Sequence, residues 1–203
     1  MIRVLICIGL IPLMHLSLSG QVIVNASFEG DPAPSSLPYG WEPCGAGSTP
    51  DTQPGSWGVL TDAASGHTYL SLICRGEGVP FPGQWETCQQ HLAQPLRAGV
   101  CYVYTVDLAH TETFAAAGIT FGGYARLRVW GAAGPCQPQQ LLWESPAVTH
   151  DTWYTYPFVF KPEADYPYIL LEAYYTVMPK YSGNILVDNL QYVPEQNPCL
   201  PTM

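Results

Sequence analysis

Positive charge is scarce in this chain. Its 203 residues include 7 Lys and Arg against 16 Asp and Glu, so the formal net charge is -9 at pH 7. Proteins that bind nucleic acid or anionic lipid need a basic surface to neutralise phosphate groups. The composition therefore excludes nucleic acid as a partner and argues against binding to anionic membranes.

Long hydrophobic runs are also lacking, apart from residues 4–16 at the start. A short basic segment precedes this run, and the small residues Ser17 to Gly20 follow it. That order is typical of a secretory signal peptide, and the run is too short to span a bilayer comfortably. We therefore expect a signal peptide over 1–20, no membrane insertion, and a secreted protein that is extracellular or periplasmic.

Zinc-binding cysteine patterns are absent, because there is no Cys-x-x-Cys pair and no clustered Cys and His spacing. An even number of cysteines in an exported chain indicates disulfides instead. Of the many possible pairings we favour Cys74 with Cys88, because they bracket the Gly- and Pro-rich loop 75–85 and a bridge would hold that loop. The cysteines beyond the leader are Cys44, Cys74, Cys88, Cys101, Cys136 and Cys199.

No segment has the 3.6-residue apolar period of a helix, and 20 Pro and 19 Gly recur throughout. Short alternating stretches separated by turn residues predict an all-β sandwich of two antiparallel sheets over 21–193, with an irregular tail over 194–203. The expected strands are Gln21–Val24, Thr68–Cys74, Glu86–Leu92, Val100–Ala109, Tyr124–Trp130, Gln139–Glu144, Thr152–Phe160, Tyr168–Thr176 and Asn184–Val193.

Alternation within these strands assigns their faces. Over 124–130, the apolar residues on one side are core candidates, and the other side carries Tyr124, Arg126, Arg128 and Trp130. Over 168–176, Glu172 and Tyr174 take the side opposite the apolar residues. Aromatic rings stack on sugar C–H surfaces and charged planar groups bind paired hydroxyls, so this face fits a neutral glycan. An ordinary solvent-facing sheet with cross-strand pairs fits equally well.

Two acids stand beside strand-like segments near the ends of the mature chain. Glu29 closes Asn25-Ala-Ser-Phe-Glu-Gly30, and Asp188 lies in Gly183-Asn-Ile-Leu-Val-Asp-Asn-Leu190. A fold that pairs the first and last strands would bring them together, and a hard divalent cation such as Ca²⁺ would offset their repulsion. Alternatively, Glu29 is a solvated turn residue and Asp188 an edge-strand acid.

Four blocks together resemble the galactose-binding-like jelly-roll carbohydrate-binding modules, closest to families 4, 9 and 22. The blocks are the opening Asn25–Gly30 with Trp41, the strand Gly66–Arg75, the approach Gln90–Tyr102, and the closing segments Leu171–Tyr175 and Asn184–Leu190. The resemblance implies a jelly-roll β-sandwich with a structural calcium ion held by Glu29 and Asp188.

The resemblance also implies a ligand site. Arg75 and Trp85 match the family's Arg-ended strand and the loop that presents a Trp, although this loop is longer and bracketed by cysteines. Glu172 and Tyr174 match the acid and ring of the penultimate strand, whereas Arg128 and Trp130 are inferred from alternation alone. Similar domains occur in secreted bacterial cell-surface proteins, where they serve adhesion or display.

Common catalytic motifs are missing, including Gly-x-Ser-x-Gly and His-Glu-x-x-His. We therefore expect a non-catalytic module that binds a glycan or cell-surface polysaccharide. Two alternatives stay open: a structural protein that contacts other surface proteins, and a glycan hydrolase or lyase. The last needs two acids facing each other across a cleft, for which Glu86, Asp107 and Glu172 are available.

Overall fold

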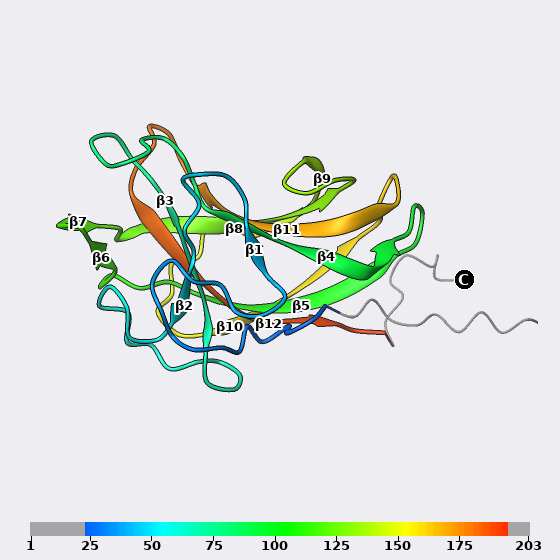
Figure 1. The fold of residues 1–203 in the computed structure, drawn as a ribbon, viewed down its shortest axis with the longest axis horizontal. Coiled ribbons are helices and arrows are strands. Elements are labelled where there is room, and N and C mark those ends of the chain that lie inside the picture. The colour runs from blue at the N-terminus through cyan, green and yellow to red at the C-terminus, as the bar shows by residue number, and fades with distance from the viewer. Residues whose placement is uncertain (1–22, 195–203) are drawn as a thin grey trace, which may run out of the picture.

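The computed structural model describes residues 23–194, which form two β-sheets packed face to face (Figure 1). The expected signal peptide over 1–20, most of the tail and Cys199 lie outside the described residues. Within 23–194, no helix is long and apolar enough to cross a membrane. The all-β sandwich predicted from the sequence is confirmed.

The two sheets, called sheet I and sheet II, contain five strands each. Sheet I contains, in spatial order, β1 (Glu42–Pro43), β4 (Thr87–Leu96), β11 (Tyr166–Tyr175), β8 (Gly123–Ala132) and β9 (Pro138–Glu144). Sheet II contains β2 (Asp51–Gln53), β3 (Tyr69–Cys74), β12 (Gly183–Tyr192), β5 (Tyr102–Ala109) and β10 (Tyr154–Phe160). These neighbours pair antiparallel. The start of β8 also pairs in parallel with β12 and joins the sheets. A small hairpin, β6 (Ala115–Ala116) and β7 (Ile119–Thr120), lies apart from both.

The core between the sheets follows the alternation of the sequence. In β8, Ala125, Leu127 and Val129 are fully buried, while the residues between them are partly exposed. Because the side-chain period of a strand is two, every second residue of β8 packs against sheet II and the rest form the outer face of sheet I. Truncating a core residue such as Leu127 to Ala should cost about 2–5 kcal/mol.

Residues 24–27 form a turn at the start of the sandwich, where the sequence predicted the end of a strand over Gln21–Val24. Residues 23 and 24 are not in a strand, and Gln21 lies outside the described residues. Asn25 closes the turn, because its side chain accepts from Glu29 N and donates to Glu29 O, at 2.8 Å each. The two ends of the sandwich are still neighbours, since Leu190 N donates to Ala26 O at 2.8 Å.

A second apolar cluster covers part of the outer face of sheet II. It lies beneath the β6–β7 hairpin and the loop before β3, on the side of β3 and β12 that faces away from the main core. Its buried members are Val59, Tyr69, Ile73, Ala109, Phe114, Phe121 and Leu186. Sheet II therefore buries apolar residues on both faces.

The cysteine pairing differs from the prediction. Cys44 is bonded to Cys136, and Cys101 is also in a disulfide. Cys74 and Cys88 are free, buried thiols, so the predicted bridge between them is wrong. Cys74 belongs to sheet II and Cys88 to sheet I, and burial raises the pKa of the Cys74 thiol to about 12.

Backbone hydrogen bonds close the loop that the bridge was expected to hold. Arg75 N donates to Gln84 O at 2.8 Å, Gly83 N to Arg75 O at 3.0 Å, and Glu86 N to Ile73 O at 2.8 Å. These bonds close the base of the loop, although β3 and β4 on either side of it belong to different sheets.

Candidate functional site

The outer face of sheet I brings together side chains from four strands. Glu144 of β9, Arg128 of β8, Glu172 of β11 and Thr87 of β4 lie directly opposite one another in register. The next row contains Trp130, Leu170 and Gln89. Residues that are far apart in sequence thus share one sheet face, on which Arg128, Trp130 and Glu144 are partly exposed and the others are buried.

All of the predicted ligand residues except Arg75 meet on this face. We call Trp85, Arg128, Trp130, Glu172 and Tyr174 the sheet-face cluster. The guanidinium carbon of Arg128 lies 3.3 Å from the centre of the Tyr174 ring, and Arg128 Nη1 lies 3.5 Å from Glu172 Oε1. The Trp85 ring packs edge-on against Tyr174, with ring centres 4.9 Å apart.

Two further residues, Arg126 and Glu144, hold the cluster in place. Arg126 Nη1 and Arg128 Nε donate to the two oxygens of Glu144, each at 2.5 Å. Burial by itself would raise the pKa of Glu144, but the hydrogen bonds and charges of Arg128 and Arg126 outweigh it and lower the pKa. Alternation had placed Arg126 on this face. Glu144 was missed, because the sequence does not show which strand lies beside β8.

Glu172 is almost fully buried, with 5% of its surface exposed. Burial raises its pKa, and the neighbouring Trp85, Arg128 and Trp130 counteract this only in part. Glu172 Oε1 and Trp130 Nε1 form no hydrogen bond of good geometry, but Arg128 Nη1 lies 3.5 Å from Glu172 Oε1 and Trp130 is close enough to act on the Glu172 carboxyl. Buried polar atoms are nearly always paired in native proteins, and the Glu172 carboxyl has polar neighbours here although its hydrogen bonding is incomplete.

Structural contacts border the face at two ends. At one end, Cys136 N donates to Gln89 Oε1 at 2.6 Å, next to the Cys44–Cys136 disulfide. At the other, Lys180 Nζ donates to Gly83 O at 2.9 Å and lies 5.9 Å from the centre of the Trp85 ring. The disulfide thus ties together the loops that flank the sheet-face cluster.

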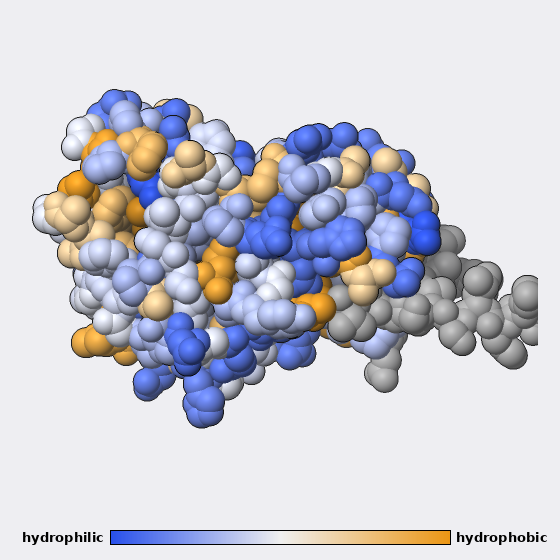
Figure 2. Space-filling view, in the orientation of Figure 1, coloured by the Kyte–Doolittle hydropathy of each residue, from blue (hydrophilic) through white to orange (hydrophobic). Residues whose placement is uncertain are grey.

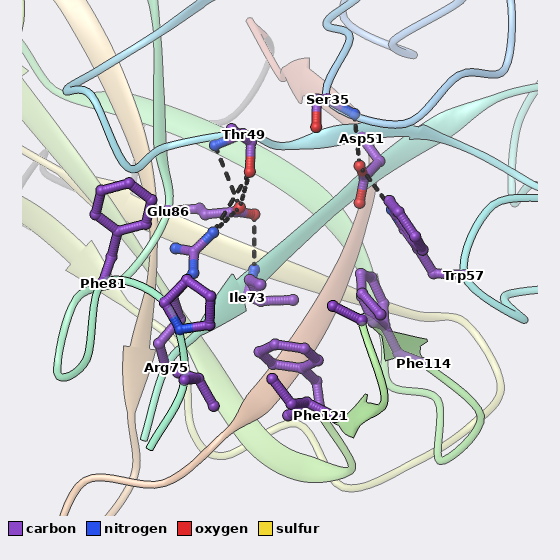
Figure 3. Close-up of a pocket in the computed structure, with 15 residues that line it drawn as sticks. Ser35, Thr49, Asp51, Trp57, Ile73, Arg75, Phe81, Glu86, Phe114 and Phe121 are labelled. Atoms are coloured by element: carbon purple, nitrogen blue, oxygen red, sulfur yellow. Dashed lines mark hydrogen bonds and ion pairs between the residues drawn. The ribbon is translucent and has the colours of Figure 1, made fainter. Parts of the chain in front are cut away.

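Arg75 lies away from this cluster, on the outer side of sheet II. Its Nη2 donates to Glu86 Oε1 at 2.7 Å, and both side chains are buried (Figure 3). The arginine that the family resemblance places in the ligand site therefore belongs to a different part of the molecule.

The predicted metal residues converge on one loop. Ser65 N donates to Asp188 Oδ2 at 2.9 Å, and His67 N donates to both oxygens of Glu29 at 3.1 Å. Between them stands Gly66, where a Cβ atom would lie 2.0 Å from Glu29 Oε1, so only glycine allows this approach. The chain brings the two carboxylates to the same short segment.

Two acids of this region, Asp107 and Asp188, are buried. Asp188 is fully buried and stands opposite Asp107 in the β12–β5 register. Burial, with a smaller contribution from Asp107, raises the pKa of Asp188 to about 7. Within residues 23–194, neither Glu29 nor Asp188 forms an ion pair with Lys or Arg, and no group of three or more His, Cys, Asp and Glu side chains is arranged around a metal position. A calcium ion there would need backbone or water oxygens in addition to the two carboxylates.

No protein-family model and no curated protein matches the chain. Among solved structures, a cyclase from Fischerella sp. in its apo form aligns with a TM-score of 0.58 at 16% identity, covering 88% of this chain and 98% of the cyclase. The K3 adhesin domain of Lys-gingipain from Porphyromonas gingivalis W83 aligns with a TM-score of 0.52 at 14% identity, covering 83% and 95%.

The CBM22-1 xylan-binding domain of Paenibacillus barcinonensis Xyn10C aligns with a TM-score of 0.49 at 17% identity, covering 85% of this chain and 94% of that domain. At identities of 14% to 17%, the likeness to these proteins is one of fold alone. The predicted resemblance is thus confirmed for the fold. The protein is a jelly-roll β-sandwich, a fold that it shares with an adhesin domain and a cyclase.

Proposed function

We propose that this protein is an exported, non-catalytic module that binds a neutral glycan on the sheet-face cluster. The observation that carries the proposal is the position of Arg128, which stacks on Tyr174 while Glu144 fixes its Nε. A guanidinium held in this way presents a flat surface beside aromatic rings, and sugars bind to such surfaces by stacking and by hydrogen bonds to paired hydroxyls.

The charge balance of the face supports a neutral ligand. Arg126 and Arg128 face Glu144 and Glu172, so positive and negative groups offset each other locally. The chain as a whole carries a formal charge of -9, which repels anionic polysaccharides at long range. A sugar hydroxyl both donates and accepts, and after a small shift of the face one would complete the hydrogen bonding of Trp130 Nε1 and Glu172 Oε1.

A disulfide and the fold support the proposal of export and of a role in adhesion. Disulfides persist in oxidising compartments, and this chain has at least the Cys44–Cys136 bridge. The shared fold with a gingipain adhesin domain is consistent with a protein that works at a cell surface. The glycan would then be a cell-surface polysaccharide, and surface proteins are a second class of partner.

A structural calcium ion is part of the proposal, held by the carboxylates of Glu29 and Asp188. The ion would offset the charge of two acids that have no basic partner within residues 23–194. Because Glu29 precedes β3 and Asp188 belongs to the last strand, these residues would tie the two ends of the sandwich to loop 65–67. The calcium ion would stabilise the folded protein and would take no part in glycan binding.

The test is titration of a broad panel of neutral oligosaccharides by calorimetry, comparing the parent with Trp130→Ala. We expect at least one glycan to bind, with an affinity at least tenfold lower in the variant, because stacked aromatic residues dominate such sites. Trp153→Ala is the matched control, since Trp153 packs on the outer side of sheet II. Folded protein that binds no glycan, or equal losses in both variants, would refute the proposal.

Glycan hydrolysis is a second candidate, favoured by one observation. Glu172 and Glu144 both approach Arg128, yet the pKa of Glu172 is raised and that of Glu144 is lowered. Two carboxyl groups with pKa values moved apart are the usual division between a general acid and a base or nucleophile. New reducing ends from a polysaccharide, abolished in Glu172→Gln, would establish this activity. Their absence leaves the binding role.

A further inference from the structure

A second site lies on the opposite side of the molecule from the sheet-face cluster. It is a pocket of about 200 Å³ between the loop after β3, the β6–β7 hairpin and the segment around β2 (Figure 3). Hydrophobic residues gather on the surface at this end of the molecule (Figure 2), where Phe81 is 49% exposed. The pocket continues the apolar cluster on the outer face of sheet II.

The pocket is mainly aromatic and aliphatic. Phe114 and Phe121 are buried at its base, while Trp57 and Phe81 are partly exposed at its edge. A cavity of about 150 Å³ with apolar walls is large enough for benzene in a well-studied case from another protein. The volume here therefore suits a single ring that carries a short substituent.

The two acids of the pocket already have their partners. Glu86 accepts from Arg75 Nη2 at 2.7 Å, from Thr49 N and Oγ1 at 3.2 and 3.0 Å, and from Ile73 N at 3.1 Å. Asp51 accepts from Ser35 N at 2.7 Å, Trp57 Nε1 at 3.1 Å and Ser71 Oγ at 3.2 Å. Neither carboxylate is short of a donor from the protein.

Arg75 differs, because its second terminal nitrogen has no partner. Nη1 is buried without a hydrogen bond, and only 8% of the side chain is exposed. The guanidinium lies between Glu86 and the Phe81 side of the pocket (Figure 3). A buried N–H group needs an acceptor, and the protein supplies none, so the missing acceptor is expected from a ligand.

The charges around Arg75 indicate what kind of acceptor fits. Glu86 neutralises the guanidinium, and Asp51 adds a further carboxylate on the same side of the pocket. A carboxylate ligand would meet this negative charge at short range in a buried site, which is costly. An uncharged oxygen, as in a carbonyl or hydroxyl group, avoids that cost.

The backbone around the pocket is held in unusual conformations. Positive φ values are uncommon for residues other than glycine, and they concentrate at functional sites. Pocket residues with positive φ are Ser35 (53°), Trp57 (57°), Phe81 (56°) and Ala117 (52°). Ser35, Trp57 and Ala117 lie in turns and Phe81 in a bend, so turns and bends border the opening of the pocket.

We propose that this pocket binds a small uncharged molecule consisting of one ring and an oxygen acceptor. The ring packs against Phe81 on the Arg75 side of the pocket (Figure 3), and the oxygen accepts from Arg75 Nη1. The pocket lies outside the sheet-face cluster, although loop 75–85 contributes Phe81 to the pocket and Trp85 to the cluster.

Three probes of similar size test the proposal on the purified chain: acetophenone, ethylbenzene and benzoate. Binding is followed by ligand-observed NMR and by Trp fluorescence. We expect acetophenone to bind at least tenfold more tightly than ethylbenzene, which lacks the acceptor, and more tightly than the anion benzoate. Equal affinities for acetophenone and ethylbenzene, tighter binding of benzoate, or no saturable binding of acetophenone would each overturn the proposal.

Variants locate the site. Arg75→Lys keeps a cation beside Glu86 but removes the second nitrogen, so the preference for acetophenone over ethylbenzene should disappear while ethylbenzene binding stays. Phe81→Ala removes a half-exposed side chain from the pocket wall and leaves the buried Arg75–Glu86 ion pair in place. The affinities for acetophenone and for ethylbenzene should both fall about fivefold. Leu60→Ala is the control, because Leu60 is an exposed apolar residue outside this pocket. If Arg75→Lys does not fold, unchanged binding in Phe81→Ala alone refutes the site.

Discussion

The guanidinium of Arg128 is held between the Tyr174 ring, 3.3 Å away, and the Glu144 carboxylate, to which its Nε donates. Both partners come from strands that flank β8, so the arginine has a defined position before any ligand arrives. A pre-positioned side chain loses little conformational freedom on binding. Substitution of Arg128 should therefore affect the proposed glycan site more than any other change.

Replacing Arg128 with Lys should lower glycan affinity about tenfold with little effect on the melting temperature. Lysine keeps the charge but cannot stack flat on Tyr174 and bind Glu144 through Nε at the same time. Calorimetry of the glycan that binds the parent gives the measurement. Arg97→Lys is the control, because Arg97 pairs with Asp165 at an exposed position. Parent-like affinity in Arg128→Lys would show that the guanidinium plane plays no part.

The cysteine pairing can be read directly by alkylation. In denaturant without reductant, we expect Cys74 and Cys88 to be labelled, because both are free thiols in the fold. Cys44 and Cys136 should be labelled only after reduction. Peptide mass spectrometry distinguishes these cases. Protection of Cys74 and Cys88 before reduction would instead support the bridge that the sequence favoured. Under native conditions the Cys74 thiol should react slowly, since burial raises its pKa to about 12.

Calcium should stabilise the protein through Glu29 and Asp188. We expect the melting temperature to rise on addition of millimolar CaCl₂ after treatment with EDTA, by several degrees, because an ion that binds only the folded state shifts unfolding by mass action. The response should be absent in Asp188→Asn. Asp165→Asn, at an exposed position, serves as the control and should keep it. A melting curve that is the same with EDTA and with calcium would contradict the metal site.

The pH dependence of stability gives a separate test of Asp188. Its folded pKa, about 7, lies above its ordinary value of 3.8, so the folded state holds a proton that the unfolded state has already released. In EDTA, the contribution of Asp188 to the free energy of unfolding should therefore be largest below pH 4 and decline as pH rises to 7.

Chemical denaturation at several pH values in EDTA measures this decline, and Asp188→Asn should flatten it. Calcium should oppose the decline, because the ion binds the carboxylate form. A parent profile that matches Asp188→Asn at every pH would mean that the pKa of Asp188 is not raised in the folded protein.

Local pattern predicted much of the sandwich. Alternation over 124–130 identified the buried and outer sides of β8 correctly, because the side-chain period of a strand depends only on the strand itself. The same reasoning placed Arg128, Trp130, Glu172 and Tyr174 on one outer face. It failed at the first strand, where the side chain of Asn25 bonds the backbone of Glu29 and closes a turn.

Contacts between distant segments were beyond local pattern. Cys44 and Cys136 are 92 residues apart, and no local pattern near either residue predicts that they form a disulfide. Arg75 follows the strand that the family resemblance identified, yet its side chain pairs with Glu86 in a pocket on the other sheet.

The sequence by itself determined that the chain is a β-sandwich and which residues share the outer face of a sheet. It also showed that Glu29 and Asp188 stand near the first and last parts of the sandwich. Tertiary structure decided the disulfide, the partner of Arg75, and the placement of Glu144 beside Arg128. The physical reason is that alternation is a property of one strand, whereas pairing depends on which strands become neighbours when the core is buried.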